Sequence, residues 1–204
     1  MENKAIKSFA QYLALWLNRY INKEGLEFAK LMLGMEIFLI NASKVIIIYS
    51  LALIFGTFPQ TAIIHVAFIL TKRHSFGLHA LNSTVCTIVS CTMFVLTPWI
   101  LSDAGIGNGI VLAAFALIIS CQYLYAPADT KAWPLIGRKL RERMKRNAVA
   151  CVAILMITAL VIPSGNIKLL LTIGAAYQTI AILPLSYKIL KRSEKNYEEY
   201  EKCA

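Results

Sequence analysis

The chain has 204 residues, of which 58% are hydrophobic and only 16% are charged, and its mean hydropathy is +0.62. Soluble domains carry about a quarter charged residues, and disordered chains combine low hydrophobicity with high charge, so this composition disfavours both classes. Several apolar runs approach the ~20 residues that a membrane-spanning helix needs, which leaves little chain for a separate soluble domain. An integral membrane protein is the expected class.

The first segment of the chain, residues 4–23, has an amphipathic pattern. Its apolar residues recur at helical spacing of three and four positions, with polar and basic residues between them. This pattern predicts a helix that lies in the membrane interface. Its expected role is to brace the membrane domain at the inner leaflet, and the alternative role is to dock an amphipathic partner.

Six apolar segments follow, separated by glycine, proline and charged residues. They cover residues 37–56, 57–71, 80–101, 108–126, 147–163 and 168–187. The second segment is the weakest, because it is short and contains His65, so a tilted or re-entrant helix is the alternative there. The predicted fold is an all-α polytopic membrane protein with six transmembrane helices and one N-terminal interfacial helix, forming a single membrane domain over residues 1–204.

The basic residues set the expected orientation. They concentrate in a loop over residues 127–146 and in the tail after Tyr187, and such segments stay on the cytoplasmic side. With the basic loop inside, the turns around 56–60, 102–107 and 164–167 fall outside, and they contain one charged residue, Asp103. We therefore expect six crossings of a cell membrane with both termini in the cytoplasm.

The basic loop also predicts partners. Contact with anionic lipid is expected from its charge alone. Lys131, Arg138 and Lys139 are candidate substrate-binding residues, because a positive loop attracts an acidic peptide segment. No nucleic-acid partner is expected, since the basic residues are held at a membrane and no nucleic-acid-binding motif accompanies them.

The stretch from Lys72 to Cys91 contains the candidate chemistry. His79 and Cys86 are seven residues apart, about two helical turns, so on a helix they share one face. An imidazole that takes the proton of a thiol makes the minimal nucleophile and base for acyl transfer. The alternative is that Cys86 is only a small hydrophobic residue inside a span.

The same residues resemble a known family. Gly77-Leu78-His79-Ala80, then Cys86 inside a span, then the Tyr125–Lys131 stretch YAPADTK at the start of a basic loop are similar to the accessory gene regulator B family of bacterial membrane cysteine endopeptidases. The resemblance extends over nearly the whole chain. Two departures concern the loop: Phe76 stands beside Gly77 where the family has a second small residue, and the upstream arginine is met by Arg73 or replaced by Lys72.

The resemblance implies a function. Cys86 would be the nucleophile and His79 the base, cutting the precursor of a quorum-sensing peptide near the cytoplasmic face of the membrane. The acyl-enzyme thioester would then be displaced within the peptide, which closes a thiolactone or lactone ring. The implied partners are a short amphipathic precursor with an acidic C-terminal segment and a second copy of the chain in a homodimer, for which Gly174, Ala175 and Ala176 offer a small-residue packing surface.

Four further residues are candidates for supporting roles. Gly77 allows the chain to bend before His79, and Arg73 is a candidate for the upstream arginine of the family, with Lys72 as the alternative. Lys44 and Cys86 are expected at similar depth, so Lys44 either faces the catalytic cavity or extends to the interface. Asp129 either orients His79 or caps a helix that begins near Thr130.

No metal or cofactor is expected, because the spacing of His65, His74 and His79 suits no standard metal site. His65 is expected to be a hydrogen-bonded packing residue. The competing function is a membrane peptide exporter or a non-catalytic adaptor, in which the polar face of the third span lines a path and Cys86 is incidental.

Overall fold

The computed structural model describes residues 4–78, 83–130, 134–193 and 196–202. Within these ranges the chain is helical and contains no β-strand, as the sequence predicts. The helices are α1 (Lys4–Ile21), α2 (Gly25–Ile54), α3 (Phe58–Ser75), α4 (Ser83–Cys91), a π-helical turn (Thr92–Leu96), α5 (Thr97–Ile100), α6 (Asn108–Tyr125), α7 (Arg138–Val161), α8 (Gly165–Ile182), α9 (Pro184–Ile189) and α10 (Tyr197–Lys202).

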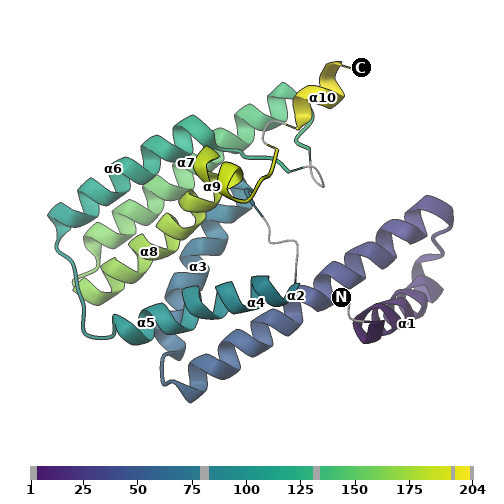
Figure 1. Ribbon diagram of the computed structural model, residues 1–204, viewed down its shortest axis with the longest axis horizontal. Helices are drawn as coiled ribbons and strands as arrows, with labels where there is room; N and C mark the ends of the chain where they lie inside the picture. The colour runs from purple at the N-terminus through teal and green to yellow at the C-terminus, as the bar shows by residue number, and fades with distance from the viewer. Residues whose placement is uncertain (1–3, 79–82, 131–133, 194–195, 203–204) are drawn as a thin grey trace.

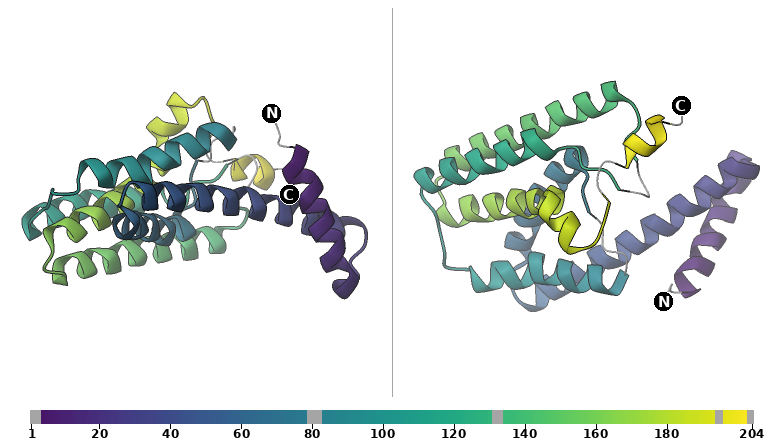
Figure 2. Two further views of the ribbon diagram at one scale, coloured as in Figure 1. Left: turned by 90° about the horizontal axis from the view of Figure 1, so that it is seen from below. Right: turned by 45° about the horizontal axis from the view of Figure 1, so that its top comes forward.

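The helices α3, α6, α7 and α8 pack together as one bundle (Figures 1 and 2). Their shared core is apolar and includes the fully buried Phe115, Val152 and Ala159. The C-terminal half of α2 and the run from α4 to α5 pack beside this bundle around Ile64, Phe94 and Leu170. The helix α1 lies against the other half of α2, and both project away from the bundle.

Small residues bring α3 and α8 into close contact. A side chain on Gly174 would lie 2.6 Å from the backbone oxygen of Ile64 and 2.7 Å from Cβ of Ala67, so only glycine fits at this crossing. Ala175 is also fully buried. Gly174 and Ala175 therefore serve packing within the chain, and the expectation that they form a dimer surface is wrong.

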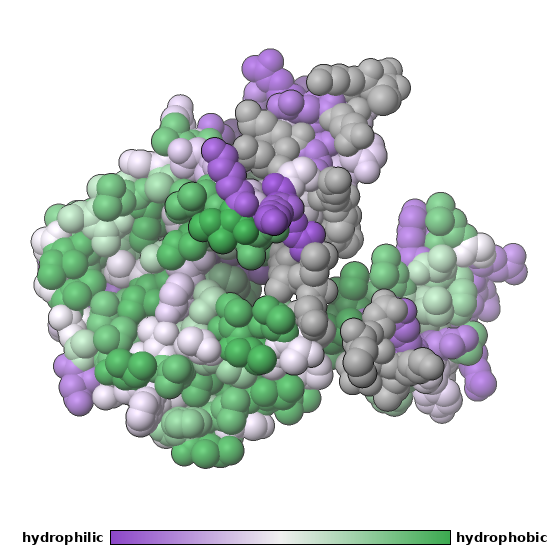
Figure 3. All heavy atoms as spheres, in the orientation of Figure 1, coloured by the Kyte–Doolittle hydropathy of each residue, from purple (hydrophilic) through white to green (hydrophobic). Residues whose placement is uncertain are grey.

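The surface of the bundle is largely apolar. Hydrophobic side chains cover most of the face in Figure 3, and the hydrophilic ones gather near the C-terminal end and at the tip of the α1–α2 arm. Three helices, α2, α6 and α7, are long and apolar enough to cross a membrane. These features indicate a membrane protein, and each of the six expected spans overlaps a helical segment, while the number of crossings stays a prediction.

Two boundaries differ from the expected ones. The helix α7 begins at Arg138, so the second half of the expected 127–146 loop is helical. The reason is local, because the run RKLRERMKR consists of strong helix formers. The helix α2 begins at Gly25, well before residue 37, and thereby includes charged residues that lie beyond the apolar run.

Two turns that the sequence expects outside the membrane lie together at one end of the bundle. The Ile106 amide donates a hydrogen bond of 3.1 Å to the Gly165 oxygen. The Asn166 amide donates to three backbone oxygens at 2.9–3.1 Å, those of Leu101, Ser102 and Ala104. The side chain of Asn166 thus ties the turn before α8 to the turn after α5.

Candidate functional site

The end of α3 and the segment after α6 are joined by backbone hydrogen bonds. Phe76 and Ala128 form a parallel bridge, in which the Ala128 amide donates to the Ser75 oxygen at 3.0 Å and the Gly77 amide donates to the Ala128 oxygen at 2.9 Å. The Leu78 amide then donates to the Ala181 oxygen in α8 at 3.1 Å. The Gly77-Leu78 and YAPADTK segments, 50 residues apart in sequence, therefore form one unit in space.

Gly77 occupies a position that excludes other residues. Its φ of +102° lies in a region that side chains rarely adopt, and a Cβ there would lie 2.9 Å from Ile182 Cγ2 and 3.0 Å from the Ala181 oxygen. Both obstacles belong to α8, and one is backbone that cannot move aside. Glycine is therefore required for the approach of this loop to α8, in addition to the bend that the sequence predicts.

A buried glutamine in α8 holds the same loop by hydrogen bonds. Gln178 is fully buried in α8, and its amide donates hydrogen bonds to Ser75 Oγ at 3.2 Å and to the Phe76 oxygen. Its own Oε1 is buried without a partner among the described residues. The sequence analysis missed Gln178, although a polar residue in an apolar segment is a signal that could have pointed to it.

Cys86 lies in the described part of α4, Ser83–Cys91. It is half-buried and is not in a disulfide. Residues 79–82 lie outside the described residues, so the depth of about six residues into a span that the sequence analysis gives to Cys86 stays a prediction.

Lys72, on the last turn of α3, lies near Cys86. It interacts by charge with Cys86 and, separately, with Lys44. The Lys72 ammonium also lies 5.0 Å from the ring centre of Phe68, a cation–π contact. The helices α2 and α4, which carry Lys44 and Cys86, are in contact, while the shared depth of these two residues stays a prediction. The sequence analysis assigns Lys72 no role at the thiol.

Other predicted site residues are placed differently. His79 and Lys131 lie outside the described residues. Arg73 is exposed at the end of α3, whereas His65 is half-buried between aromatic rings and its Nδ1 lies 3.2 Å from the Tyr49 hydroxyl. His65 is therefore the packing residue that the sequence predicts.

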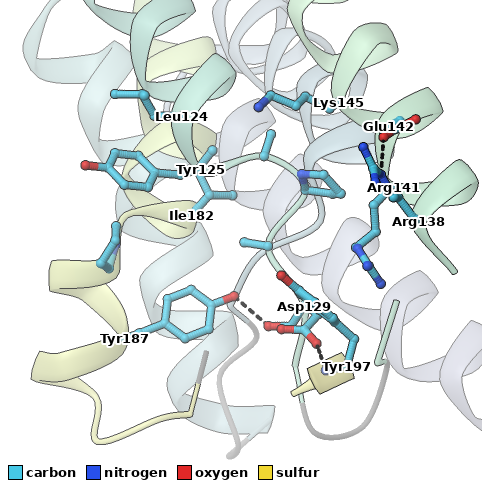
Figure 4. Close-up of a pocket in the computed structure, with 14 residues that line it drawn as sticks. Leu124, Tyr125, Asp129, Arg138, Arg141, Glu142, Lys145, Ile182, Tyr187 and Tyr197 are labelled. Carbon is cyan, nitrogen blue, oxygen red and sulfur yellow. Dashed lines mark hydrogen bonds and ion pairs between the residues drawn. The ribbon is translucent and has the colours of Figure 1, made fainter. Parts of the chain in front are cut away.

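Asp129 caps a helix that the sequence analysis does not consider. Its carboxylate accepts hydrogen bonds from the Asn196 amide at 3.1 Å and the Tyr197 amide at 2.8 Å, at the start of α10. No helix begins at Thr130. Asp129 thus caps a helix, but the helix that it caps is α10 in the C-terminal tail. The Asp129 backbone oxygen also accepts from the hydroxyl of the buried Tyr187 at 2.8 Å (Figure 4).

A polar cavity of about 430 Å³ lies beside Asp129, between the end of α6, the start of α7 and α9 (Figure 4). Its charged lining residues are Asp129, Arg138, Arg141, Glu142 and Lys145. Arg138, a predicted substrate-binding residue, pairs with Glu142 at 2.7 Å, while Lys139 is exposed and is not part of the described lining. A cavity with three cations and two carboxylates suits an anionic peptide segment.

The described residues form a helical membrane protein with a cysteine on α4, a hydrogen-bonded loop after α3 and a cavity whose lining includes charged residues of α7. Residues 6–182 match the family model described as Accessory gene regulator B. The chain therefore belongs to the accessory gene regulator B family, which takes part in quorum-sensing systems.

Individual relatives agree with this assignment. An AgrB-like protein of Listeria innocua is 45% identical over 88% of this chain and 87% of its own length. One of Clostridium acetobutylicum is 39% identical over 98% of this chain and 96% of its own length. Accessory gene regulator protein B of Staphylococcus epidermidis is 35% identical over 91% of this chain and 92% of its own length. No solved structure matches the chain.

Proposed function

We propose that the protein is a membrane cysteine endopeptidase that processes the precursor of a quorum-sensing peptide. Cys86 is the nucleophile and His79 the base in this proposal. The observation that carries it is the charge interaction between Cys86, on α4, and Lys72, on the last turn of α3. A nearby cation favours the thiolate form of a cysteine.

The reaction begins with proton transfer from the Cys86 thiol to the His79 imidazole. The thiolate attacks the scissile carbonyl, and His79 returns the proton to the leaving amine, so the C-terminal fragment departs and a thioester remains on Cys86. A cysteine or serine side chain within the bound peptide then attacks the thioester carbonyl. This step releases Cys86 and closes a thiolactone or lactone ring in the peptide.

The clamped loop supports the role of His79. Residues 75–78 are held by hydrogen bonds with Ala128, Gln178 and Ala181, up to the residue before His79. A base acts efficiently only when its position relative to the nucleophile is fixed, and a shift of about 1 Å can cost about a hundredfold in rate. We assign this positioning function to the clamp.

The test is intact-mass spectrometry of the protein in liposomes after brief incubation with the short peptide encoded beside its gene. The expected result is an acyl adduct on Cys86 that hydroxylamine removes and that is absent from Cys86→Ala and His79→Ala. Tight peptide binding with neither adduct nor cleavage would overturn the proposal and would favour a peptide exporter or a non-catalytic adaptor.

A further inference from the structure

The C-terminal tail returns to the basic start of α7. There the guanidinium of Arg141 donates two hydrogen bonds to the Glu201 carboxylate, at 2.6 Å to Oε1 and 3.1 Å to Oε2. The Gly137 amide donates a third, at 3.0 Å to Oε1. Figure 1 shows α10, which carries Glu201, beside this end of α7. Two parallel guanidinium bonds together with a backbone amide are a specific arrangement for a carboxylate.

The Arg141 side chain is oriented by contacts that do not involve Glu201. It donates to the Leu135 oxygen at 2.9 Å, and its guanidinium lies 3.9 Å from the centre of the Tyr197 ring. Only 18% of the Arg141 side chain is exposed, against 36% for Glu201. A partly buried arginine with a fixed fork loses little conformational freedom when it binds a carboxylate, so the site suits a carboxylate from another source as well.

The position of this site connects it to the candidate active site. Arg141, Tyr197 and Asp129 all line the cavity beside the YAPADTK segment. Ala128 of that segment bridges to Phe76, three residues before His79. A peptide bound in the cavity therefore lies next to the loop that leads to the proposed base.

The ion pair between Glu201 of the tail and Arg141 can be exchanged for a pair with another carboxylate. The carboxylate is partly exposed to solvent, and water and salt screen ion pairs between solvent-exposed groups. The short helix α10 is otherwise attached mainly through its capping contacts with Asp129. An acidic segment that makes the same three hydrogen bonds and further contacts in the cavity can displace the Glu201 carboxylate.

We infer that Arg141 and the Gly137 amide form a carboxylate-binding subsite for the acidic segment of the peptide substrate, and that Glu201 occupies it as an intramolecular competitor. This inference rests on the proposed function for the identity of the ligand. The tail thus lowers the apparent affinity for an acidic peptide by the fraction of molecules in which the subsite is filled.

A binding experiment tests the inference without catalysis. The full-length protein with Cys86→Ala is placed in nanodiscs, and binding of a fluorescent peptide is followed by anisotropy. The peptide has the sequence of residues 196–202, NYEEYEK, with both ends blocked so that only side-chain carboxylates are present. A second peptide with glutamine in place of the last glutamate reports how much of the binding requires that carboxylate.

The expected result is that Glu201→Gln in the protein tightens binding of the acidic peptide about three- to tenfold, because the subsite is vacated. The matched control is Glu198→Gln, which removes the same charge from an exposed position on the same helix and leaves affinity unchanged. Arg141→Gln weakens binding in both backgrounds, and Arg141→Lys restores it only in part, since lysine lacks the two-pronged geometry.

Equal affinity of the Glu201→Gln and Glu198→Gln proteins would overturn the inference, as would equal binding of the two peptides to Glu201→Gln. The outcome is separable from that of the proposed function. Competition in the Cys86→Ala protein together with no cleavage by the wild type refutes only the peptidase. Cleavage by the wild type together with no effect of Glu201→Gln refutes only the subsite.

Discussion

The amide of Gln178 donates a hydrogen bond of 3.2 Å to Ser75 Oγ, which links the buried face of α8 to the last turn of α3. The same amide donates to the Phe76 oxygen. Because this carbonyl lies beside the chain that leads to His79, Gln178 is a positioning residue for the proposed base.

We predict that Gln178→Met lowers the rate of precursor cleavage at a temperature at which the protein is folded. Loss of the amide leaves the partly buried Phe76 oxygen without this donor, which costs up to about 1–3 kcal/mol, and releases the loop. Cleavage rates, kcat separately from KM, and thermal unfolding are the measurements. A fall in kcat with little change in KM is expected.

Gln122→Met is the matched control for Gln178→Met. Gln122 is also fully buried, in α6, but its amide donates to Thr179 Oγ1 at 3.1 Å and not to the loop. Both substitutions should lower the unfolding temperature, and only Gln178→Met should reduce kcat at a temperature where both are folded. Equal loss of kcat in the two variants would show that Gln178 acts through general stability alone.

Gly77→Ala should reduce cleavage by about a hundredfold, since displacement of a catalytic loop by about 1 Å has that order of effect. The added Cβ would meet Ile182 Cγ2 at 2.9 Å and the Ala181 oxygen at 3.0 Å, at a φ of +102°. Gly109→Ala is the control, because a Cβ there meets nothing within 4 Å. Wild-type cleavage by Gly77→Ala would contradict the clamp that we describe.

Lys44→Met should slow the alkylation of Cys86 by iodoacetamide at neutral pH, measured by mass spectrometry of the Cys86 peptide. The reason is that thiolates react and nearby cations stabilise them. We expect Lys44→Arg, which keeps the charge, to retain most of the rate. Lys72→Met should act in the same direction, because Lys72 interacts by charge with Cys86. The exposed Lys188 in α9 provides a control substitution, Lys188→Met. Unchanged alkylation in both Lys44→Met and Lys72→Met would remove the electrostatic argument for Cys86.

Docking of the tail should depend on pH. The hydrogen bonds from Arg141 and from the Gly137 amide hold the pKa of Glu201 below its ordinary value of 4.5. Because the pKa is lowered in the docked state, this contribution to docking is fully present above pH 4.5 and is lost as the pH falls through the lowered value.

The measurement is the anisotropy of a fluorophore at the C-terminus as the pH is lowered from neutral. The wild type should keep a high anisotropy at neutral pH and lose it in acid. Glu201→Gln should start lower and lose the part of the transition that belongs to Glu201. Identical curves for the two proteins would show that Glu201 does not hold the tail.

Counting residues along two apolar segments predicts a similar depth for Lys44 and Cys86, because a helix rises by a constant ~1.5 Å per residue. That depth stays a prediction, since residues 79–82 before α4 lie outside the described residues. The structure adds that α2 and α4 are in contact and that Lys72 of α3 interacts by charge with Cys86. Counting along single segments does not predict these contacts between helices.

The sequence by itself determined the helical membrane class, the amphipathic first helix and the family, because composition, apolar periodicity and short motifs are local properties. It also predicted functional roles for Gly77, Cys86 and the YAPADTK stretch. Only the tertiary structure decided which of these lie together: the bridge from Phe76 to Ala128, the glutamine beneath it and the pairing of Arg141 with Glu201. These contacts join residues 50 or more positions apart, and they depend on how α3, α6 and α8 pack. Helix packing is set by the fit of whole surfaces, such as the close approach at Gly174, which no local pattern encodes.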